Sequence, residues 1–119
     1  EWWYFTGNLR DPVRQRDFGY QLTFFRQGVE PPRRKAPAQS GSAWRFGNFY
    51  FAHFGFSDIG PRKFYAADRV FRGSLGEVEI AKDRFAVRLG DWKAVSVEEA
   101  GGVETFSLKA RDGDRVIDL

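Results

Sequence analysis

The 119-residue sequence contains no cysteine and no methionine, and it has a single histidine, His53. Without cysteine the chain forms no disulfide and offers no thiolate for catalysis or metal binding. A lone histidine without a second histidine or a cysteine cannot build a zinc site, so we expect no metal site in this chain. Because no initiating methionine is present, we expect these residues to be part of a longer protein.

Several longer sequence features are missing as well. No apolar run approaches the roughly 20 residues that a membrane-spanning helix needs, and no signal peptide is present. The sequence has no glycine-rich phosphate loop, nucleophile elbow or paired metal-ligand motif. Residues 16–20 are similar to the aromatic core of an RNA-binding strand, but the match fails at Asp17, Gln21 and Thr23. The two helices of that fold are also missing, so we expect no nucleic-acid partner.

The chain is rich in aromatic residues and in glycine, with 13 Phe, 4 Tyr, 4 Trp and 13 Gly. Aromatic residues favour strands and glycine favours tight turns, so we predict a mostly β protein. A chain of this length forms one domain and buries roughly two-thirds of the surface of the unfolded chain. The net charge of +3 is uneven, because residues 10–45 carry +5 and the rest −2. Basic loops of this kind serve solubility or bind an anion.

The first strand pattern holds four consecutive aromatic residues, Trp2, Trp3, Tyr4 and Phe5, directly after Glu1. Side chains alternate between the two faces of a strand, so Trp3 and Phe5 share one face while Trp2 and Tyr4 share the other. Large rings on both faces need an apolar cover on both. We therefore expect a core on one side of this strand and a ligand cavity or a second domain on the other. Either face is a candidate wall of the cavity.

Short strand patterns continue along the chain, with turn residues between them. The predicted strands span residues 1–9, 18–26, 48–58, 63–72, 85–89, 92–97, 103–110 and 115–119. This spacing favours an antiparallel sandwich or barrel in which the first two strands form a hairpin. Residues 27–47, rich in proline, glycine and serine, are expected to form one long loop. Residues 75–82 carry no clear pattern. The chain stops within an apolar strand pattern, and we expect more protein to follow because natural proteins avoid an unpaired sheet edge.

Two polar residues stand within these apolar strands. His53 is either a core histidine bonded to a neighbour or a general acid or base that faces a cavity. Gln21 needs hydrogen-bond partners if its face is buried. The acids on adjoining strands that could supply them are Glu1, Asp58 and Asp68.

Four motifs follow one another in order along the chain. They are Glu-Trp-Trp-Tyr-Phe-Thr-Gly-Asn-Leu at 1–9, Phe-Gly-Tyr-Gln-Leu-Thr-Phe-Phe-Arg at 18–26, Tyr-Phe-Ala-His-Phe at 50–54 with Ser-Asp at 57–58, and Asp-Trp at 91–92. Together they closely resemble the amino-terminal lipocalin-like domain of the AttH and carotenoid 1,2-hydratase family. The resemblance implies an all-β fold, an antiparallel lipocalin-like β-barrel. Residues 1–119 would form most of that barrel, with a long loop at 27–47, and a second lipocalin-like domain would lie outside this chain.

The resemblance also implies a range of activities. Members of that family include hydratases that add water to carbon–carbon double bonds of carotenoids or of kievitone, similar fungal cyclases, and many proteins known only as predicted secreted hydrolases. The implied function is a cofactor-free hydro-lyase or cyclase, or a domain that binds a hydrophobic isoprenoid, carotenoid-like or polyketide-like molecule. The family favours a periplasmic or secreted location and permits peripheral membrane contact. Many relatives have histidine where this chain has Asn8, so a mechanism that needs an imidazole at that position fails here.

Hydration of an isolated alkene without a cofactor needs an acid, surroundings that tolerate a carbocation, and a placed water. Aromatic faces tolerate the cation, at about 0.5–2 kcal/mol per ring, and a carboxyl group buried among rings has a raised pKa and can donate a proton. The candidate catalytic residues are His53, Asp58 and Asp68. The candidate ligand-binding residues are Trp2, Trp3, Tyr4, Tyr20, Gln21 and Phe51. Two alternatives remain: a carrier that performs no chemistry, and a structural domain that packs on a second, catalytic barrel.

Overall fold

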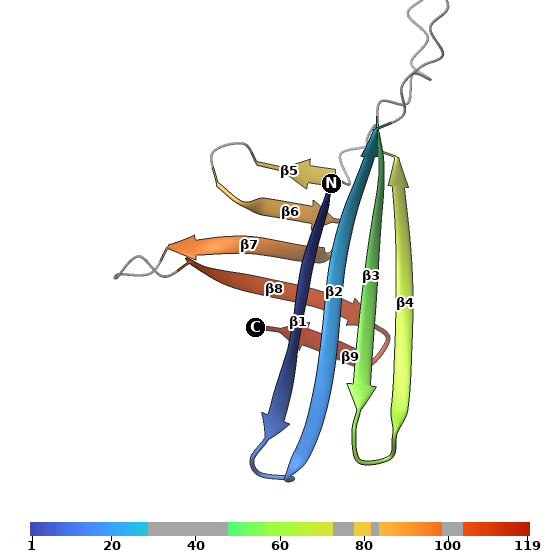
Figure 1. The fold of residues 1–119 in the computed structure, drawn as a ribbon, viewed down its shortest axis with the longest axis vertical. Coiled ribbons are helices and arrows are strands. Elements are labelled where there is room, and N and C mark those ends of the chain that lie inside the picture. The colour runs from blue at the N-terminus through green and yellow to red at the C-terminus, as the bar shows by residue number, and fades with distance from the viewer. Residues whose placement is uncertain (29–47, 73–77, 82–83, 99–103) are drawn as a thin grey trace, which may run out of the picture.

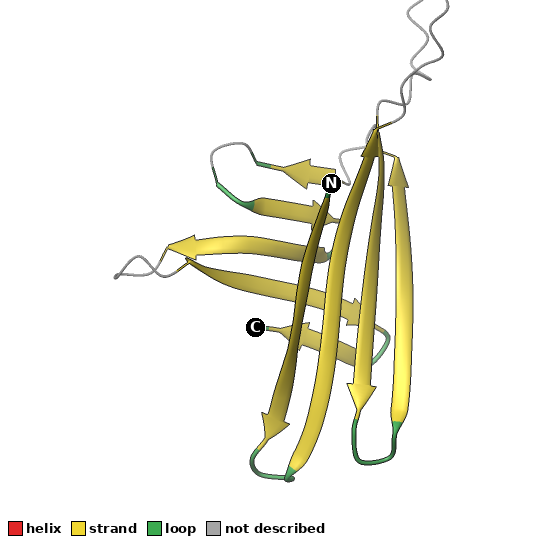
Figure 2. Cartoon of the chain, in the orientation of Figure 1, coloured by secondary structure: helices red, strands yellow, loops and turns green. Residues whose placement is uncertain are grey.

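The computed structural model describes residues 1–28, 48–72, 78–81, 84–98 and 104–119. In this part of the chain the regular elements are all strands, and none is a helix (Figure 2). The strands are β1 (Trp2–Asp11), β2 (Arg16–Gly28), β3 (Asn48–Asp58), β4 (Lys63–Arg72), β5 (Val78–Ile80), β6 (Ala86–Leu89), β7 (Trp92–Glu98), β8 (Glu104–Asp112) and β9 (Arg115–Asp118). The prediction of an all-β chain is confirmed.

The strands form two antiparallel sheets, each with its strands in chain order. One sheet has the order β1-β2-β3-β4 and the other β5-β6-β7-β8-β9. Figure 1 shows that the strands of the five-stranded sheet run crosswise behind the long strands of the four-stranded sheet. No strand pairing joins the two sheets within the described ranges. The antiparallel architecture is therefore confirmed as two packed sheets, while closure into a barrel stays a prediction.

Most predicted strands lie where the sequence pattern places them. β3 and β4 have the predicted bounds, and β1 and β2 form the predicted hairpin, in which Trp3 pairs with Phe24 and Phe5 pairs with Leu22. β5 was missed, because its three residues form a strand by pairing with β6. The predicted long loop at 27–47 is shorter at its start, since β2 runs to Gly28. Its remaining residues, 29–47, lie outside the described ranges.

The core lies between the two sheets. From the four-stranded sheet, Leu22, Phe24 and Phe54 point toward the five-stranded sheet and are almost fully buried. Trp92 of β7 is the largest fully buried side chain, and its ring meets Phe54 edge-on at 5.8 Å. Burial of each large apolar side chain stabilises the fold by about 1.5–3 kcal/mol. This packing covers one face of the four-stranded sheet, which we call the inner face. Within the described ranges no second sheet packs on the opposite, outer face.

Candidate functional site

The outer face of the four-stranded sheet carries an apolar row that crosses all four strands. The register pairs Trp2 with Phe25, Phe25 with Phe51, and Phe51 with Val70. The rings of Trp2 and Phe25 stack at 5.9 Å between centroids. Trp2 is 76% exposed and Val70 is 62% exposed. Four large apolar side chains in one row on an uncovered face mark a surface that binds something apolar.

The apolar row borders an open cleft of about 480 Å³. Residues from the start of β1, the end of β2 and the middle of β3 line this cleft: Glu1, Trp2, Phe25, Arg26, Gln27, Phe51 and His53. Glu1 and Arg26 form an ion pair at its rim, with their charged atoms 2.5 Å apart. His53 is the third ionisable side chain in this lining, and its ion-pair partner, Asp68, lies outside the lining on the next strand.

His53 and Asp68 form a cross-strand pair beside the apolar row. They are register partners on β3 and β4, and His53 Nδ1 lies 2.5 Å from Asp68 Oδ1. The edge of the imidazole also meets Phe25, with 5.1 Å between centroids. An ionised carboxylate accepts a hydrogen bond from Nδ1–H, which fixes the tautomer and leaves Nε2 free of the proton when the ring is neutral. Nε2 then accepts a proton when the ring is neutral and donates one when the ring is charged.

The other predicted ligand-binding residues divide between the two faces. Tyr4 and Gln21 lie on the outer face. Tyr4 is two residues along β1 from Trp2, and Gln21 is four residues along β2 from Phe25. Gln21 is exposed, and its Nε2 donates to Thr23 Oγ1 at 3.5 Å, so its partner is none of the three acids that we expected. Trp3 and Tyr20 lie on the inner face. Trp3 packs edge-on against Phe85 at 6.0 Å, and both side chains belong to the packing between the sheets.

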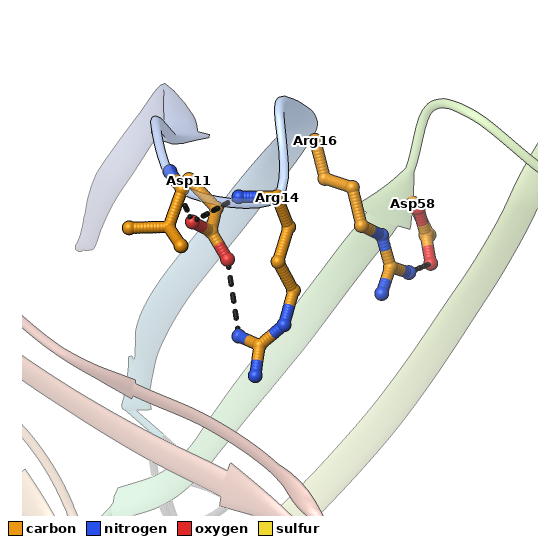
Figure 3. A network of polar contacts seen from close by, with 5 residues as sticks. Asp11, Arg14, Arg16 and Asp58 are labelled. Carbon is orange, nitrogen blue, oxygen red and sulfur yellow. Dashed lines mark hydrogen bonds and ion pairs between the residues drawn. The ribbon is translucent and has the colours of Figure 1, made fainter.

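Asp58 lies apart from the other two candidate catalytic residues. It is buried on the inner face at the end of β3, about 17 Å along the strand from His53. Its Oδ2 accepts from Arg16 (Figure 3), and its Oδ1 is buried without a hydrogen-bond partner among the described residues. The structure therefore joins His53 to Asp68 and separates both from Asp58, which links the start of β2 to the end of β3.

Asp11, at the start of the β1–β2 turn, lies close to the Arg16–Asp58 ion pair (Figure 3). Asp11 Oδ1 accepts from the backbone N–H groups of Val13 and Arg14, at 2.9 and 3.0 Å, and Oδ2 accepts from the Arg14 guanidinium (Figure 3). The backbone N–H of Arg14 is the main cause that lowers the pKa of Asp11 below its usual value of 3.8. Asp11 thus holds the β1–β2 turn, far along the sheet from the cleft.

Sequence reasoning missed Phe25 and Val70 as members of the outer face. The signal for Phe25 was present, because the alternation that puts Gln21 and Thr23 on one face also puts Phe25 there. Val70 needed the register between β3 and β4, which pairs it with Phe51.

Comparison with known proteins places this chain in a family. The family described as AttH-like matches residues 1–119, the whole chain. The chain belongs to the AttH-like family. A solved structure from Nitrosomonas europaea, of a protein assigned to AttH, has a similar fold, with a TM-score of 0.70 and 21% identity. The match covers 98% of this AttH-like chain and 31% of that protein. A search among curated proteins finds no match.

No group of three or more histidine, cysteine or acidic residues in the described ranges is arranged to hold a metal ion. Where the structure describes the chain, it holds no helix long and apolar enough to cross a membrane.

Proposed function

We propose that the outer face of the four-stranded sheet binds a hydrophobic small molecule of the isoprenoid, carotenoid-like or polyketide-like class. The observation that carries this proposal is the apolar row, of which Trp2, Phe25 and Phe51 line a cleft of about 480 Å³ beside the His53–Asp68 pair. The residues 1–119 are proposed to form most of a lipocalin-like barrel, joined to a second lipocalin-like domain of the same protein.

The free energy for binding comes from the exposed rings. Covering apolar surface contributes about 25 cal/mol per Å², so a ligand that covers the exposed parts of Trp2 and Val70 gains about 1–2 kcal/mol from each side chain. The binding surface is already formed before the ligand binds, because the strands hold these side chains in one row. A rigid, preformed row loses little conformational entropy on binding.

The His53–Asp68 pair supplies acid–base chemistry for hydration of a carbon–carbon double bond. The charged imidazole donates the proton on Nε2 to one alkene carbon, and the π electrons form the new C–H bond. Water then attacks the neighbouring cationic carbon and returns a proton to Nε2, so the sum is the addition of one water without a cofactor. The rings of Trp2 and Phe25 stabilise the cation by cation–π attraction, and Asp68 orients the imidazole.

The exposure of this pair favours a second candidate function. The side chains of His53 and Asp68 are 48% and 68% exposed, and proton transfer to an alkene needs a site from which bulk water is excluded. A domain that only carries a hydrophobic ligand needs no such exclusion. If the domain is catalytic, the second lipocalin-like domain covers the His53–Asp68 pair and excludes water from it. If the domain has a purely structural role, the second domain packs directly on the apolar row.

Ligand binding is tested with the full-length protein and the dye N-phenyl-1-naphthylamine, displaced by farnesol. Trp2→Ala is expected to weaken farnesol binding about tenfold, the effect of losing roughly 1.4 kcal/mol of apolar contact. Ile59→Ala removes an exposed apolar side chain from the β3–β4 turn and is expected to leave binding unchanged. If the protein takes up neither dye nor farnesol and contains no ligand by native mass spectrometry, the proposal is wrong.

Catalysis is tested with a panel of isoprenoid alkenes in water labelled with heavy oxygen. A hydratase yields a product that carries the labelled oxygen, and a cyclase yields a new ring. The rate is expected to follow the ionisation of an imidazole in the wild-type protein and to lose that pH dependence in His53→Gln. Binding of farnesol without any labelled or cyclised product identifies a carrier instead.

A further inference from the structure

The outer face holds a second hollow beyond the His53–Asp68 pair. It is a groove of about 170 Å³ on the same side of the sheet. Its lining comes from β1, β2, β3 and the start of β4 and includes Asn8, Gly19, Gln21, Gly55, Ser57 and Phe64. No charged residue occurs in this lining, in contrast to the cleft at the apolar row.

The groove lies where two adjacent strands carry glycine, Gly19 on β2 and Gly55 on β3, so that no side chain fills the space. Gly19 on β2 pairs with Asn8 on β1 and with Ser57 on β3. A methyl group built on Gly19 would lie 3.6 Å from Ser57 Cβ and 3.9 Å from Asn8 Oδ1, which are ordinary contacts. Alanine therefore fits at Gly19 without strain and fills part of the groove, which makes it a clean probe of the groove's role.

The groove presents hydrogen-bonding groups that the described residues leave unused. The amide of Asn8 and the hydroxyl of Ser57 have no hydrogen-bond partner in the described part of the chain. Gln21 uses one N–H toward Thr23 and keeps its carbonyl oxygen. Amides and hydroxyls can both donate to and accept from a neutral group. They give no counter-charge to an anion, whose desolvation would be uncompensated.

The groove and the apolar row lie at a defined separation along the same strands. Phe25 and Gly19 are six residues apart on β2, which corresponds to roughly 20 Å in an extended strand. The His53–Asp68 pair lies between them, since His53 pairs with Thr23. One elongated molecule that lies along β2 can therefore touch the row, the pair and the groove.

We infer that the ligand of the outer face is amphipathic, with an uncharged hydroxyl or carbonyl group at one end that is bound in this groove. The inference rests on the proposed function, because the apolar end of the same ligand lies on the apolar row. Asn8 and Ser57 bind the polar end, and Gly19 and Gly55 give it room. The ring of Phe64 lies over Gly55, 3.3 Å from where a Cβ would be, and forms one wall.

The test compares geranylgeraniol with the matched hydrocarbon and with geranylgeranyl phosphate, each displacing the same dye from the full-length protein. The alcohol is expected to bind about tenfold more tightly than the hydrocarbon, which is the net effect of hydrogen bonds at the groove. The phosphate is expected to bind more weakly than the alcohol. Geraniol, too short to reach from the row to the groove, is expected to gain little over its own hydrocarbon.

Two variants assign the preference to the groove. Gly19→Ala and Ser57→Ala are each expected to bring the affinity for geranylgeraniol down toward that for the hydrocarbon, with the affinity for the hydrocarbon unchanged. Gly60→Ala is the matched control, because a methyl group there meets no atom within 4 Å. Equal affinity for alcohol and hydrocarbon in the wild-type protein overturns the inference but leaves the proposed function standing. If no prenyl compound displaces the dye, both are wrong.

Discussion

The two faces of the four-stranded sheet are both rich in aromatic residues, yet they differ in what covers them. On the inner face, Leu22, Phe24 and Phe54 are at most 2% exposed, whereas Trp2 on the outer face is 76% exposed. The outer rings pack on one another along the sheet, and no second sheet among the described residues covers them. The same kind of residue therefore stabilises the fold on one face and remains available for a ligand on the other.

The polar groups differ in the same way. On the inner side, Trp92 Nε1 donates to Arg111 O at 2.9 Å, and Arg69 lies over the Trp92 ring at 4.4 Å while it pairs with Asp91. On the outer face, the imidazole of His53 is bound to Asp68 through Nδ1 and lines the cleft. The polar groups around Trp92 bind other groups of the protein, whereas the imidazole of His53 also borders a cleft that a ligand can enter.

The largest expected effect tests the inner face. Trp92→Ala should lower the free energy of unfolding by about 3–5 kcal/mol, because it leaves a large cavity and removes the donor to Arg111 O. Urea denaturation measures this change, and Trp92→Phe should cost less because its smaller loss of volume leaves a smaller cavity. A cost below about 1 kcal/mol for Trp92→Ala would show that the two sheets do not share this core.

The next effect tests the ionic link at the end of the sheet. Arg16→Ala should destabilise the protein by about 1–3 kcal/mol, because the buried Asp58 carboxylate loses its partner. Arg14→Ala is the matched control, since Arg14 is more exposed and pairs with Asp11 in the neighbouring turn, and its cost should stay below about 1 kcal/mol. Equal unfolding free energies for the two variants would contradict a structural role for Asp58.

A smaller effect on stability is expected on the outer face. Trp2→Ala should lower the free energy of unfolding by no more than about 1 kcal/mol, because the Trp2 side chain is mostly exposed and the substitution removes little more than the stacking on Phe25. The same variant should bind farnesol about tenfold more weakly. A large loss of stability on urea denaturation would instead show that the Trp2 ring packs against another part of the full-length protein.

The smallest expected effect concerns pH. The pKa of Asp11 is lowered in the folded state, so its ionised form stabilises the fold above pH 3.8, and this contribution is lost as the pH falls through the lowered value. Asp11→Asn should therefore show a flatter dependence of the thermal midpoint on pH below about pH 4 than the wild-type protein. Parallel curves for the two proteins would mean that this carboxylate does not contribute to acid unfolding.

Much of the fold was predictable because its signals are local. β3 and β4 were predicted at their observed bounds, since residues 48–58 are apolar on both faces and turn residues at 59–61 separate them from the next strand pattern. β5 was not predicted, because its three residues become a strand only by pairing with β6. A pattern read along one segment cannot report a partner that lies elsewhere in the chain.

The candidate site was predictable in part for the same reason. His53 and Phe51 share a face by alternation along β3. The contact between His53 and Asp68 needed the register across the β3–β4 hairpin. Tyr20 resembled a ligand-binding residue by type, but its ring lies on the inner face, so close to Gly7 that a Cβ there would be 2.8 Å from Tyr20 Cε1.

The sequence by itself determined which side chains share a face, because the two-residue period of a strand is a local property of the backbone. It thus separated Trp2 and Tyr4 from Trp3 and Phe5 before any fold was known. Only the tertiary structure decided which of these two aromatic faces is buried. That choice depends on where the five-stranded sheet packs, because the first residues of β1 carry large rings on both faces.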